Sequence, residues 1–452
     1  MIHAKYHFPD SFLWGTATSS HQVEGQNDNN DWWAWEHQPD RILHNQKSGI
    51  ACDWWNGRWK EDFDRAAEDG QNSHRLSIEW SRIEPGPALW DDDALAYYSE
   101  IIQGALDREL VPMVTLHHFT NPTWISERGG WENPETVKYF ERYVHKVVSR
   151  LKEFVRLWVT INEPNVYMYE SYGSGMFPPG KKDIKSWPHV ARNLIRGHAA
   201  AYHAIHSLQE DALVGVAHHY RGFRPANARN PIERMMVRVR SRTFNNLFTR
   251  ALTDGHMSLL HWRDRIPEAK KSQDFLGLNY YTVEEFGFDP LNPGSFFREG
   301  VLPEGAELSP TGFIANIPEG MRTALKWARA FGLPIYVTEN GIEDEGDTVR
   351  PGYLLRHLLE VWKAANMNWQ VKGYYHWSLV DNFEWDRGWT QRFGLWELDR
   401  VSQKRTRRPS SELYAEICKT NSISSDCVRR FAPQISDDLF PPKGPAELTD
   451  RE

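Results

Sequence analysis

The sequence predicts an α/β fold, a single closed (β/α)8 barrel of the TIM type with elaborated βα loops. Short apolar runs of strand length recur along the chain, and helical apolar patterns separate most of them. Two of these runs end in a glutamate, and all strands of a parallel barrel end on one face, where active sites lie. The 452 residues show neither an internal repeat nor a low-complexity linker, which favours one large barrel over several domains.

Eight short apolar runs are expected to form the barrel strands. In chain order they are Phe12–Thr18, His74–Trp80, Val111–His118, Leu157–Pro164, Leu213–His219, Asp274–Tyr281, Pro334–Gly341 and Val371–Trp377. The helices expected between them are Trp59–Gly70, Asp91–Glu109, Pro134–Lys152, Val190–Gln209, Glu319–Phe331 and Pro351–Asn366. We expect residues 1–430 to form the barrel and residues 431–452 to form an irregular C-terminal tail.

The segment Arg221–Arg250 does not fit the alternating pattern. It holds eight arginines and a single acidic residue, Glu233. We expect an inserted helix whose arginines pair with an acidic rim of the barrel. Binding of an anionic surface by the same arginines is the alternative.

Composition excludes several classes of partner. The net charge of −8 gives no reason to expect nucleic acid, and no apolar stretch approaches the length of a membrane span. The first residues lack the apolar core of a signal peptide, and Cys52, Cys418 and Cys427 are too few for a disulfide framework. A cytoplasmic, reduced protein is therefore expected, with a Cys418–Cys427 bridge as the alternative.

Two histidine pairs, His117-His118 and His218-His219, raise the question of a metal site. Adjacent residues on a strand point to opposite faces, so neither pair can chelate one ion on its own. No Cys or His pairs have zinc-site spacing, and no glycine-rich phosphate loop follows a strand. We therefore expect neither a metal nor another cofactor.

The two glutamates at strand ends are Glu163, within Thr160–Pro164, and Glu339, within Val337–Gly341. A carboxylate at the tip of a buried strand must be solvated, paired or used in chemistry. Two carboxylates on one rim suit cleavage of a glycosidic bond, which needs an acid at the leaving oxygen and a carboxylate at the anomeric carbon. For either glutamate alone, a satisfied strand-end acid is the alternative.

These two motifs, together with the segment Trp377–Trp385, resemble glycoside hydrolase family 1, the family of β-glucosidases and β-galactosidases. The resemblance runs from Phe12 to about Tyr414. It implies that Glu163 is the acid/base and Glu339 the nucleophile of a retaining, two-step mechanism. Glu339 must be ionised to attack and Glu163 must first hold a proton, so a raised pKa is expected for Glu163.

The resemblance also implies a set of supporting and sugar-contacting residues. The arginine beside the nucleophile is matched by Arg75, whose charge is expected to keep Glu339 ionised. The other matched positions are Gln22, His118 and Glu384 for the outer hydroxyls, Asn162 for the 2-hydroxyl, Tyr281 for a hydrogen bond to the nucleophile with Asn279 near it, and Trp377, Trp385 and Phe393 for the sugar ring and its rim.

The sequence departs from the family pattern at Phe119, where tryptophan is usual, and at Asn121, where leucine is usual. Residues 31–40, 165–180 and 289–315 are expected to build the aglycone side. These loops vary most within the family, so the resemblance implies no particular leaving group. Since a phosphate would meet the like charge of Glu384, we expect non-phosphorylated substrates.

The expected partner is a small-molecule β-glycoside or short oligosaccharide, without nucleic acid or membrane. β-Glucosidase activity is the first choice, and β-galactosidase or β-fucosidase activity fits the same pocket. A transglycosylase on the same two glutamates is the nearest alternative. A non-catalytic sugar-binding protein is a further one, although such a protein would often have lost one of the two carboxylates.

Overall fold

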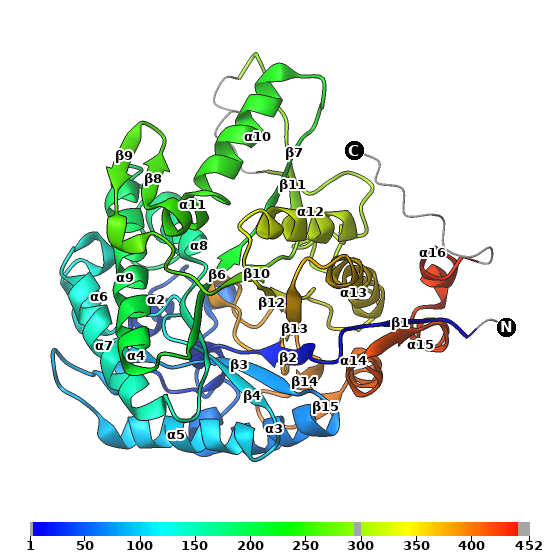
Figure 1. Cartoon of the computed structure of the whole chain (residues 1–452), viewed down its shortest axis with the longest axis horizontal. Helices are drawn as coiled ribbons and strands as arrows, with labels where there is room; N and C mark the ends of the chain where they lie inside the picture. The colour runs from blue at the N-terminus through cyan, green and yellow to red at the C-terminus, as the bar shows by residue number, and fades with distance from the viewer. Residues whose placement is uncertain (1–2, 293–299, 442–452) are drawn as a thin grey trace.

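The chain forms a closed barrel of eight parallel strands, which confirms the predicted fold class (Figure 1). The computed structural model describes residues 3–292 and 300–441. Around the barrel the strands are β2 (Leu13–Ala17), β3 (Ser73–Ser77), β4 (Val111–Thr115), β5 (Leu157–Asn162), β6 (Leu213–His219), β10 (Phe275–Asn279), β12 (Ile335–Asn340) and β13 (Val371–Trp377). Each coincides with one predicted strand, and most are shorter than predicted because the chain turns away where the polar tip residues begin.

The predicted helices cover the outside of the barrel as α3 (Trp59–Glu68), α5 (Asp92–Leu106), α7 (Thr136–Leu151), α9 (Trp187–Leu208), α12 (Pro318–Arg329) and α13 (Arg350–Asn366). Helix α7 shows why this pattern folds: Phe140, Tyr143, Val144, Val147 and Leu151 recur at helical spacing and are all buried. None of the described helices is long and apolar enough to cross a membrane.

The lower part of the barrel lumen is filled by side chains rather than open. Met113, Val159, Phe275, Tyr336 and Tyr375 belong to one buried apolar cluster contributed by five different strands. Filling of this kind is typical of parallel barrels, whose interior is a packed core. Consequently the space available to a ligand lies at the carboxyl ends of the strands.

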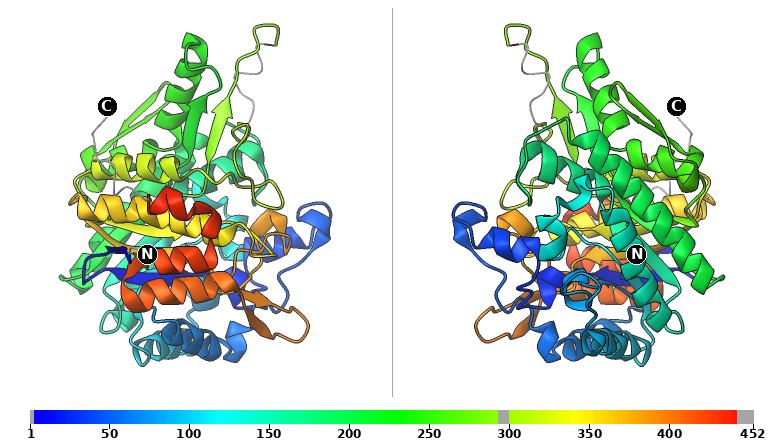
Figure 2. Two further views of the ribbon diagram at one scale, coloured as in Figure 1. Left: turned by 90° about the vertical axis from the view of Figure 1, so that its right-hand side faces the viewer. Right: turned by 90° about the vertical axis from the view of Figure 1, so that its left-hand side faces the viewer.

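The two ends of the described chain lie together. Strand β1 (Lys5–His7) pairs antiparallel with β16 (Ser422–Ser424), beside α14 (Pro409–Thr420) and α15 (Ser425–Phe431), as the left view of Figure 2 shows. The expected irregular tail begins instead with the helical turns η8 (Pro433–Ile435) and α16 (Ser436–Leu439).

Anchoring by the N-terminal strand explains those turns. The Tyr6 hydroxyl donates to the carbonyl of Leu439 at 2.6 Å, and the Tyr6 ring stacks on Phe440 at 4.6 Å. These contacts are long-range, so a local sequence pattern could not indicate them. Residues 442–452 of the expected tail lie outside the described residues.

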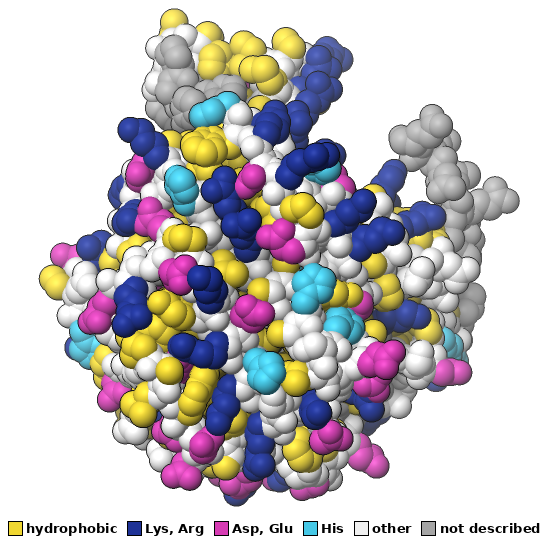
Figure 3. All heavy atoms as spheres, turned by 60° about the vertical axis from the view of Figure 1, so that its left-hand side comes forward, with side chains coloured by type: hydrophobic (Ala, Val, Ile, Leu, Met, Phe, Trp, Pro, Cys, Tyr) yellow, Lys and Arg dark blue, Asp and Glu magenta, His cyan; other side chains and the backbone are white. Residues whose placement is uncertain are grey.

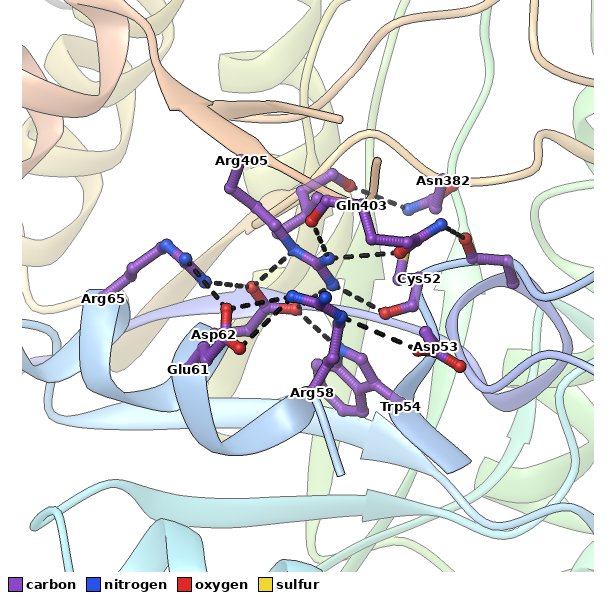
Figure 4. Close-up of polar contacts among 12 residues, drawn as sticks. Cys52, Asp53, Trp54, Arg58, Glu61, Asp62, Arg65, Asn382, Gln403 and Arg405 are labelled. Carbon is purple, nitrogen blue, oxygen red and sulfur yellow. Dashed lines mark hydrogen bonds and ion pairs between the residues drawn. The ribbon is translucent and has the colours of Figure 1, made fainter. Parts of the chain in front are cut away.

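A buried polar network ties the C-terminal hairpin, β14 (Trp396–Leu398) and β15 (Arg405–Arg407), to α3 (Figure 4). The Arg405 guanidinium donates to both carboxylate oxygens of Asp62 at 3.1 and 3.0 Å and to the carbonyl of Cys52 at 2.6 Å. Cys52 donates through its thiol to the carbonyl of Asp381 at 3.3 Å. The network thereby anchors the segment after β13 that carries Glu384. The three cysteines are free thiols, so the alternative Cys418–Cys427 bridge is not formed.

An arm made of β7 (Gly222–Pro225), α10 (Pro231–Thr243) and β11 (Val283–Phe286) projects from the strand-end side of the barrel (Figure 1). It contains the predicted arginine-rich helix. Arg221 pairs with Glu284 at 3.0 Å, but Arg234, Arg238 and Arg242 are exposed and form no ion pair with a described residue.

The expectation that these arginines pair with an acidic rim is therefore wrong for most of them. The helix stands away from the barrel (Figure 1), so Arg234, Arg238 and Arg242 meet no barrel carboxylate among residues 3–292 and 300–441. Figure 3 shows lysine and arginine side chains gathered on this upper part of the molecule.

Candidate active site

Glu163 and Glu339 line one cavity of about 430 Å³ at the carboxyl ends of the strands. Glu163 directly follows β5, Glu339 is the fifth residue of β12, and the two are 6% and 4% exposed. Also on the cavity wall are seven further predicted residues: His118, Asn162, Tyr281, Trp377, Glu384, Trp385 and Phe393. Gln22, Arg75 and Asn279 lie behind this wall as hydrogen-bond partners of its members.

The Glu339 carboxylate is held by two donors. Arg75 Nη1 lies 2.5 Å from its Oε1, and the Tyr281 hydroxyl donates to its Oε2 at 2.7 Å. Burial raises the pKa of Glu339 to about 7, against the lowering effect of the Arg75 charge and with a further rise from Glu163. Burial and the second carboxyl thus outweigh Arg75, which lowers the pKa of Glu339 as expected but does not hold it at its ordinary value.

The backbone of Glu163 turns sharply out of the strand. Its φ and ψ of 44° and 58° are left-handed, and Pro164 occupies the first turn of α8 (Pro164–Tyr169). The amide N–H donates to the carbonyl of Ala217 on the neighbouring strand at 2.8 Å. This geometry, unusual for a residue other than glycine, is held by the strand behind and the proline ahead, and it aims the side chain into the cavity.

Two donors converge on Oε1 of Glu163. Asn279 Nδ2 lies 2.8 Å away and His219 Nδ1 lies 2.9 Å away. Burial raises the pKa of Glu163, but the charge and hydrogen bond of His219 and the Asn279 donor together bring it below its ordinary value. The expected raised pKa of Glu163 is therefore not found, and the partner responsible is a histidine that sequence analysis weighed only as a metal ligand.

A continuous chain of hydrogen bonds joins the two carboxylates. Arg75, bonded to Glu339, donates through Nη2 to Asn162 Oδ1 at 2.7 Å. Asn279 donates to that same oxygen at 3.2 Å and to Glu163 at 2.8 Å. Because every member is buried, the relative positions of the two carboxylates are fixed by the barrel rather than by mobile loops.

The far side of the cavity has the residues expected to meet a sugar. His118 Nε2 accepts from Asn162 Nδ2 at 3.0 Å, and the His118 ring lies face to face with Trp377 at 6.0 Å and Trp385 at 5.9 Å. Gln22 Nε2 donates to Glu384 at 3.1 Å. Burial raises the pKa of Glu384 to about 8, with smaller contributions from Glu339 and Asp386.

The mouth of the cavity is lined differently from expectation. Residues 166–177 and 300–314 contribute, as predicted for two of the three loops. No residue of 31–40 lines it, because Trp32 packs beneath, 4.7 Å from Trp385 and 4.8 Å from Phe177. Residues 293–299 of the third loop lie outside the described residues.

Sequence analysis missed a third side of the mouth. Three aromatic side chains there are Trp187, Phe223 and Phe244, and Arg221 and Arg240 lie beside them. Only the aromatic residues interspersed among the arginines of 221–250 could have indicated this wall.

Adjacent histidines do point to opposite faces, as strand geometry predicts. His118 and His219 face the cavity, whereas His117 contacts Asn121 at 3.1 Å and His218 contacts Gln273 at 3.0 Å. Among residues 3–292 and 300–441, no cluster of three or more His, Cys, Asp or Glu side chains could hold a metal ion.

Comparison with known proteins agrees with this geometry. The model of glycosyl hydrolase family 1 matches residues 4–423. A 1,4-beta-D-glucan glucohydrolase of Thermotoga neapolitana is 32% identical over 92% of this chain and 99% of its own length. Among solved structures, a beta-glycosidase from Pyrococcus horikoshii matches with a TM-score of 0.88 and 36% identity, over 95% of this chain and 98% of the other.

A beta-glucosidase from Thermotoga maritima, solved in complex with deoxynojirimycin, matches with a TM-score of 0.86 and 31% identity over 93% of this chain and all of the other. With the family model covering almost the whole chain and two buried carboxylates on one cavity, the protein belongs to glycosyl hydrolase family 1 and is a β-glycosidase.

Proposed function

We propose that the protein is an exo-acting, retaining β-glycosidase that hydrolyses non-phosphorylated β-D-glycosides, with β-glucosides preferred and β-galactosides or β-fucosides also accepted. The observation that carries this proposal is the hydrogen-bonded chain from Glu339 through Arg75, Asn162 and Asn279 to Glu163. It holds two buried carboxylates on one cavity, and paired carboxylates are what double displacement at an anomeric carbon requires.

In the first step Glu339 acts as the nucleophile. Its ionised carboxylate attacks the anomeric carbon and forms a glycosyl ester, while the bond to the leaving oxygen breaks. Arg75 and Tyr281 hold the attacking group by the hydrogen bonds described above, and they restrict it to one orientation. Glu163 gives its proton to the leaving oxygen, so the aglycone departs as a neutral alcohol.

In the second step water enters the vacated aglycone side. Glu163, now ionised, removes a proton from the water as the oxygen attacks the anomeric carbon. The ester bond to Glu339 breaks, and the sugar leaves with its original β configuration. The proton ends on Glu163, so the pair returns to its starting state, in which Glu163 is protonated and Glu339 is ionised.

Glycone selection rests on the deep side of the cavity. Trp377 and Trp385 offer aromatic surface and an indole N–H to the ring, and His118 and Asn162 offer polar atoms to its hydroxyls. Glu384 can accept from the 4- and 6-hydroxyls in either gluco or galacto configuration. A 6-phosphate dianion there would face the buried carboxyls of Glu384 and Asp386, which supports non-phosphorylated substrates.

A cytoplasmic location is part of the proposal. It is supported by Cys52, Cys418 and Cys427, which are all buried free thiols.

The test is hydrolysis of aryl β-glycosides in the gluco, galacto, fuco, manno, xylo and 6-phosphogluco series, with the first product anomer followed by NMR. A β-sugar as first product, with glucosides best and 6-phosphoglucosides inert, is expected. An α-sugar as first product would contradict the retaining scheme. Glu339→Ala should lose almost all turnover and recover it with azide, giving an α-glycosyl azide, whereas unassisted hydrolysis by this variant would overturn the assignment.

A further inference from the structure

His219 lies between the proposed acid/base and the cavity. It is the last residue of β6, it lines the cavity, and its Nδ1 lies 2.9 Å from Oε1 of Glu163. The ring stacks on Tyr281 at 5.8 Å and 27° and meets Phe244 edge-on at 5.9 Å. Asn165 Nδ2 donates to the His219 carbonyl at 2.7 Å. The imidazole is therefore held by two aromatic rings and at its backbone.

The second donor to Oε1 has its own orientation fixed. The Thr338 hydroxyl donates to Asn279 Oδ1 at 2.6 Å, so the amide group of Asn279 must present its NH₂ side to Glu163. An amide NH₂ can only donate. Oε1 of Glu163 must therefore accept from Asn279, and a proton on Oε1 would point at these donors.

The same reasoning shows which ring nitrogen of His219 carries a hydrogen. With Oε1 acting as an acceptor, Nδ1 of the imidazole must carry a hydrogen and donate it. Oε2 of Glu163, in contrast, makes no hydrogen bond with any residue of the described chain, and the side chain lines the cavity. A proton bound by Glu163 is consequently directed to Oε2, the oxygen left free for a leaving group.

We propose that His219 is a positioning residue which, by donating from Nδ1 to Oε1 of Glu163, places the acid proton on Oε2 and holds that oxygen toward the glycosidic bond. This inference rests on the proposed function, in which Glu163 is the acid/base. His219 itself neither gives nor takes a proton in the reaction. It acts through the carboxyl that it holds.

The titratable groups near His219 determine which ionisation a pH–rate profile of a His219 variant can detect. The ring itself contacts Glu163 and Tyr281, while Arg221, paired with Glu284, lies over the neighbouring Phe244 ring at 5.3 Å. Glu170 and Tyr169 lie near Arg221. Burial raises the pKa of Tyr281 well above its ordinary value, so Tyr281 stays neutral across the working range. A hydrogen bond donated to a carboxylate favours the ionised form, so loss of the His219 donor raises the pKa of Glu163.

Two substitutions distinguish the effect of the hydrogen bond donated by His219 from the effect of its side-chain volume. His219→Leu keeps an apolar side chain against Tyr281 and Phe244 but removes the donor. His219→Asn keeps a donor, because an asparagine amide nitrogen can occupy the position of Nδ1. The matched control is His218→Asn, one residue earlier on β6, where the ring faces away from the cavity toward Gln273 and Trp327.

The measurement is kcat/KM against pH for two aryl glycosides, one with a poor leaving group that needs the acid proton and one with a dinitrophenolate leaving group that does not. For His219→Leu we expect a loss of about tenfold or more with the poor leaving group, within the roughly 10²–10⁴-fold that general acid catalysis supplies. The loss with dinitrophenolate should be small. The alkaline limb for the poor leaving group should move to higher pH.

His219→Asn should recover most of the rate, and His218→Asn should follow the wild-type profile. Equal losses on both substrates, no loss on either, or an alkaline limb that stays in place in His219→Leu would overturn the inference. Failure of the proposed function would look different. In that case Glu163→Ala would not discriminate between the two leaving groups either.

Discussion

Arg75 Nη1 lies 2.5 Å from Oε1 of Glu339, and both side chains are buried at the carboxyl end of the barrel. The same guanidinium reaches Asn162, so one cation orients the proposed nucleophile and a proposed sugar-binding amide together. Arginine suits this position because its planar fork can make two directed bonds at once, which a lysine ammonium cannot do with the same geometry.

Replacing Arg75 by methionine should therefore damage both stability and catalysis. Removing one partner of a buried ion pair leaves an uncompensated charge and costs about 3–5 kcal/mol. The Arg75 charge lowers the pKa of Glu339, so its loss should raise that pKa and move the acid limb of kcat/KM to higher pH. Denaturant unfolding and a pH–rate profile measure the two effects. Arg75→Lys should restore part of the stability but less of the rate, and an unmoved acid limb in Arg75→Met would contradict this account.

Tyr281→Phe removes the other donor to Glu339. A hydrogen bond to a charged group contributes about 1.5–3 kcal/mol, which corresponds to a loss of roughly 10- to 150-fold in kcat/KM if the bond is kept in the transition state. The matched control is Tyr375→Phe, which removes a 2.7 Å hydrogen bond to Ser73 deep in the barrel. Its activity should stay close to wild type. Similar losses of activity in both variants would show that packing, rather than donation to Glu339, is responsible.

Because several histidines are buried, we expect the free energy of unfolding to fall at acidic pH. Burial lowers the pKa of His74, His198 and His357 to about 3, so the folded chain leaves them neutral where the unfolded chain binds protons. Between about pH 6.5 and 3 the unfolded state binds more protons, and stability therefore falls as pH falls, by up to about 1.4 kcal/mol per pH unit for each histidine. Carboxyls with raised pKa values, such as Asp31 at about 7, act in the opposite direction over part of this range.

A single-site comparison isolates the histidine effect. The difference in unfolding free energy between pH 7 and pH 5 should be smaller in His357→Gln than in wild type, as measured by denaturant titration. His145→Gln, on the exposed face of α7, should keep the wild-type difference. An unchanged pH dependence in His357→Gln would argue against a neutral buried imidazole at that position.

The Arg405–Asp62 pair offers a test of how the C-terminal hairpin is attached. Arg405→Met should destabilise the protein by about 1.5–3 kcal/mol, because Asp62 and the Cys52 carbonyl lose a charged donor while Arg65 stays bonded to Asp62. Breaking the exposed Arg430–Glu412 pair by Glu412→Ala should cost only about 0–1 kcal/mol. Equal and small effects of the two substitutions would show that the network in Figure 4 does not hold the hairpin.

The eight strands and the positions of Glu163 and Glu339 could be predicted because both depend on local patterns. A short apolar run followed by a carboxylate is visible in the sequence, and a parallel barrel collects such ends on one face. The resemblance also implied Arg75 beside Glu339 and a hydrogen bond from Tyr281, and the structure has both contacts.

The pKa of Glu163 could not be predicted in the same way. Its direction depends on His219, a residue of the next strand whose ring meets Glu163 only after the barrel closes. The lining of the cavity mouth could not be predicted either. Phe223 and Phe244 reach the mouth on an arm, and no local sequence pattern gives the angle of that arm. The same angle explains why Arg234, Arg238 and Arg242 do not pair with acids as expected. The arm holds them away from the carboxylates of the barrel.

The central claim is that Glu339 forms a covalent bond to the sugar. The most direct test is incubation of the wild-type protein with a 2-deoxy-2-fluoro-β-glucosyl fluoride, followed by mass spectrometry of the intact chain and of its peptides. The account predicts one added fluoroglucosyl group, carried by the peptide that contains Glu339, with loss of activity at the same rate. An adduct on another residue, or an active protein that forms no adduct while hydrolysing β-glucosides, would contradict it.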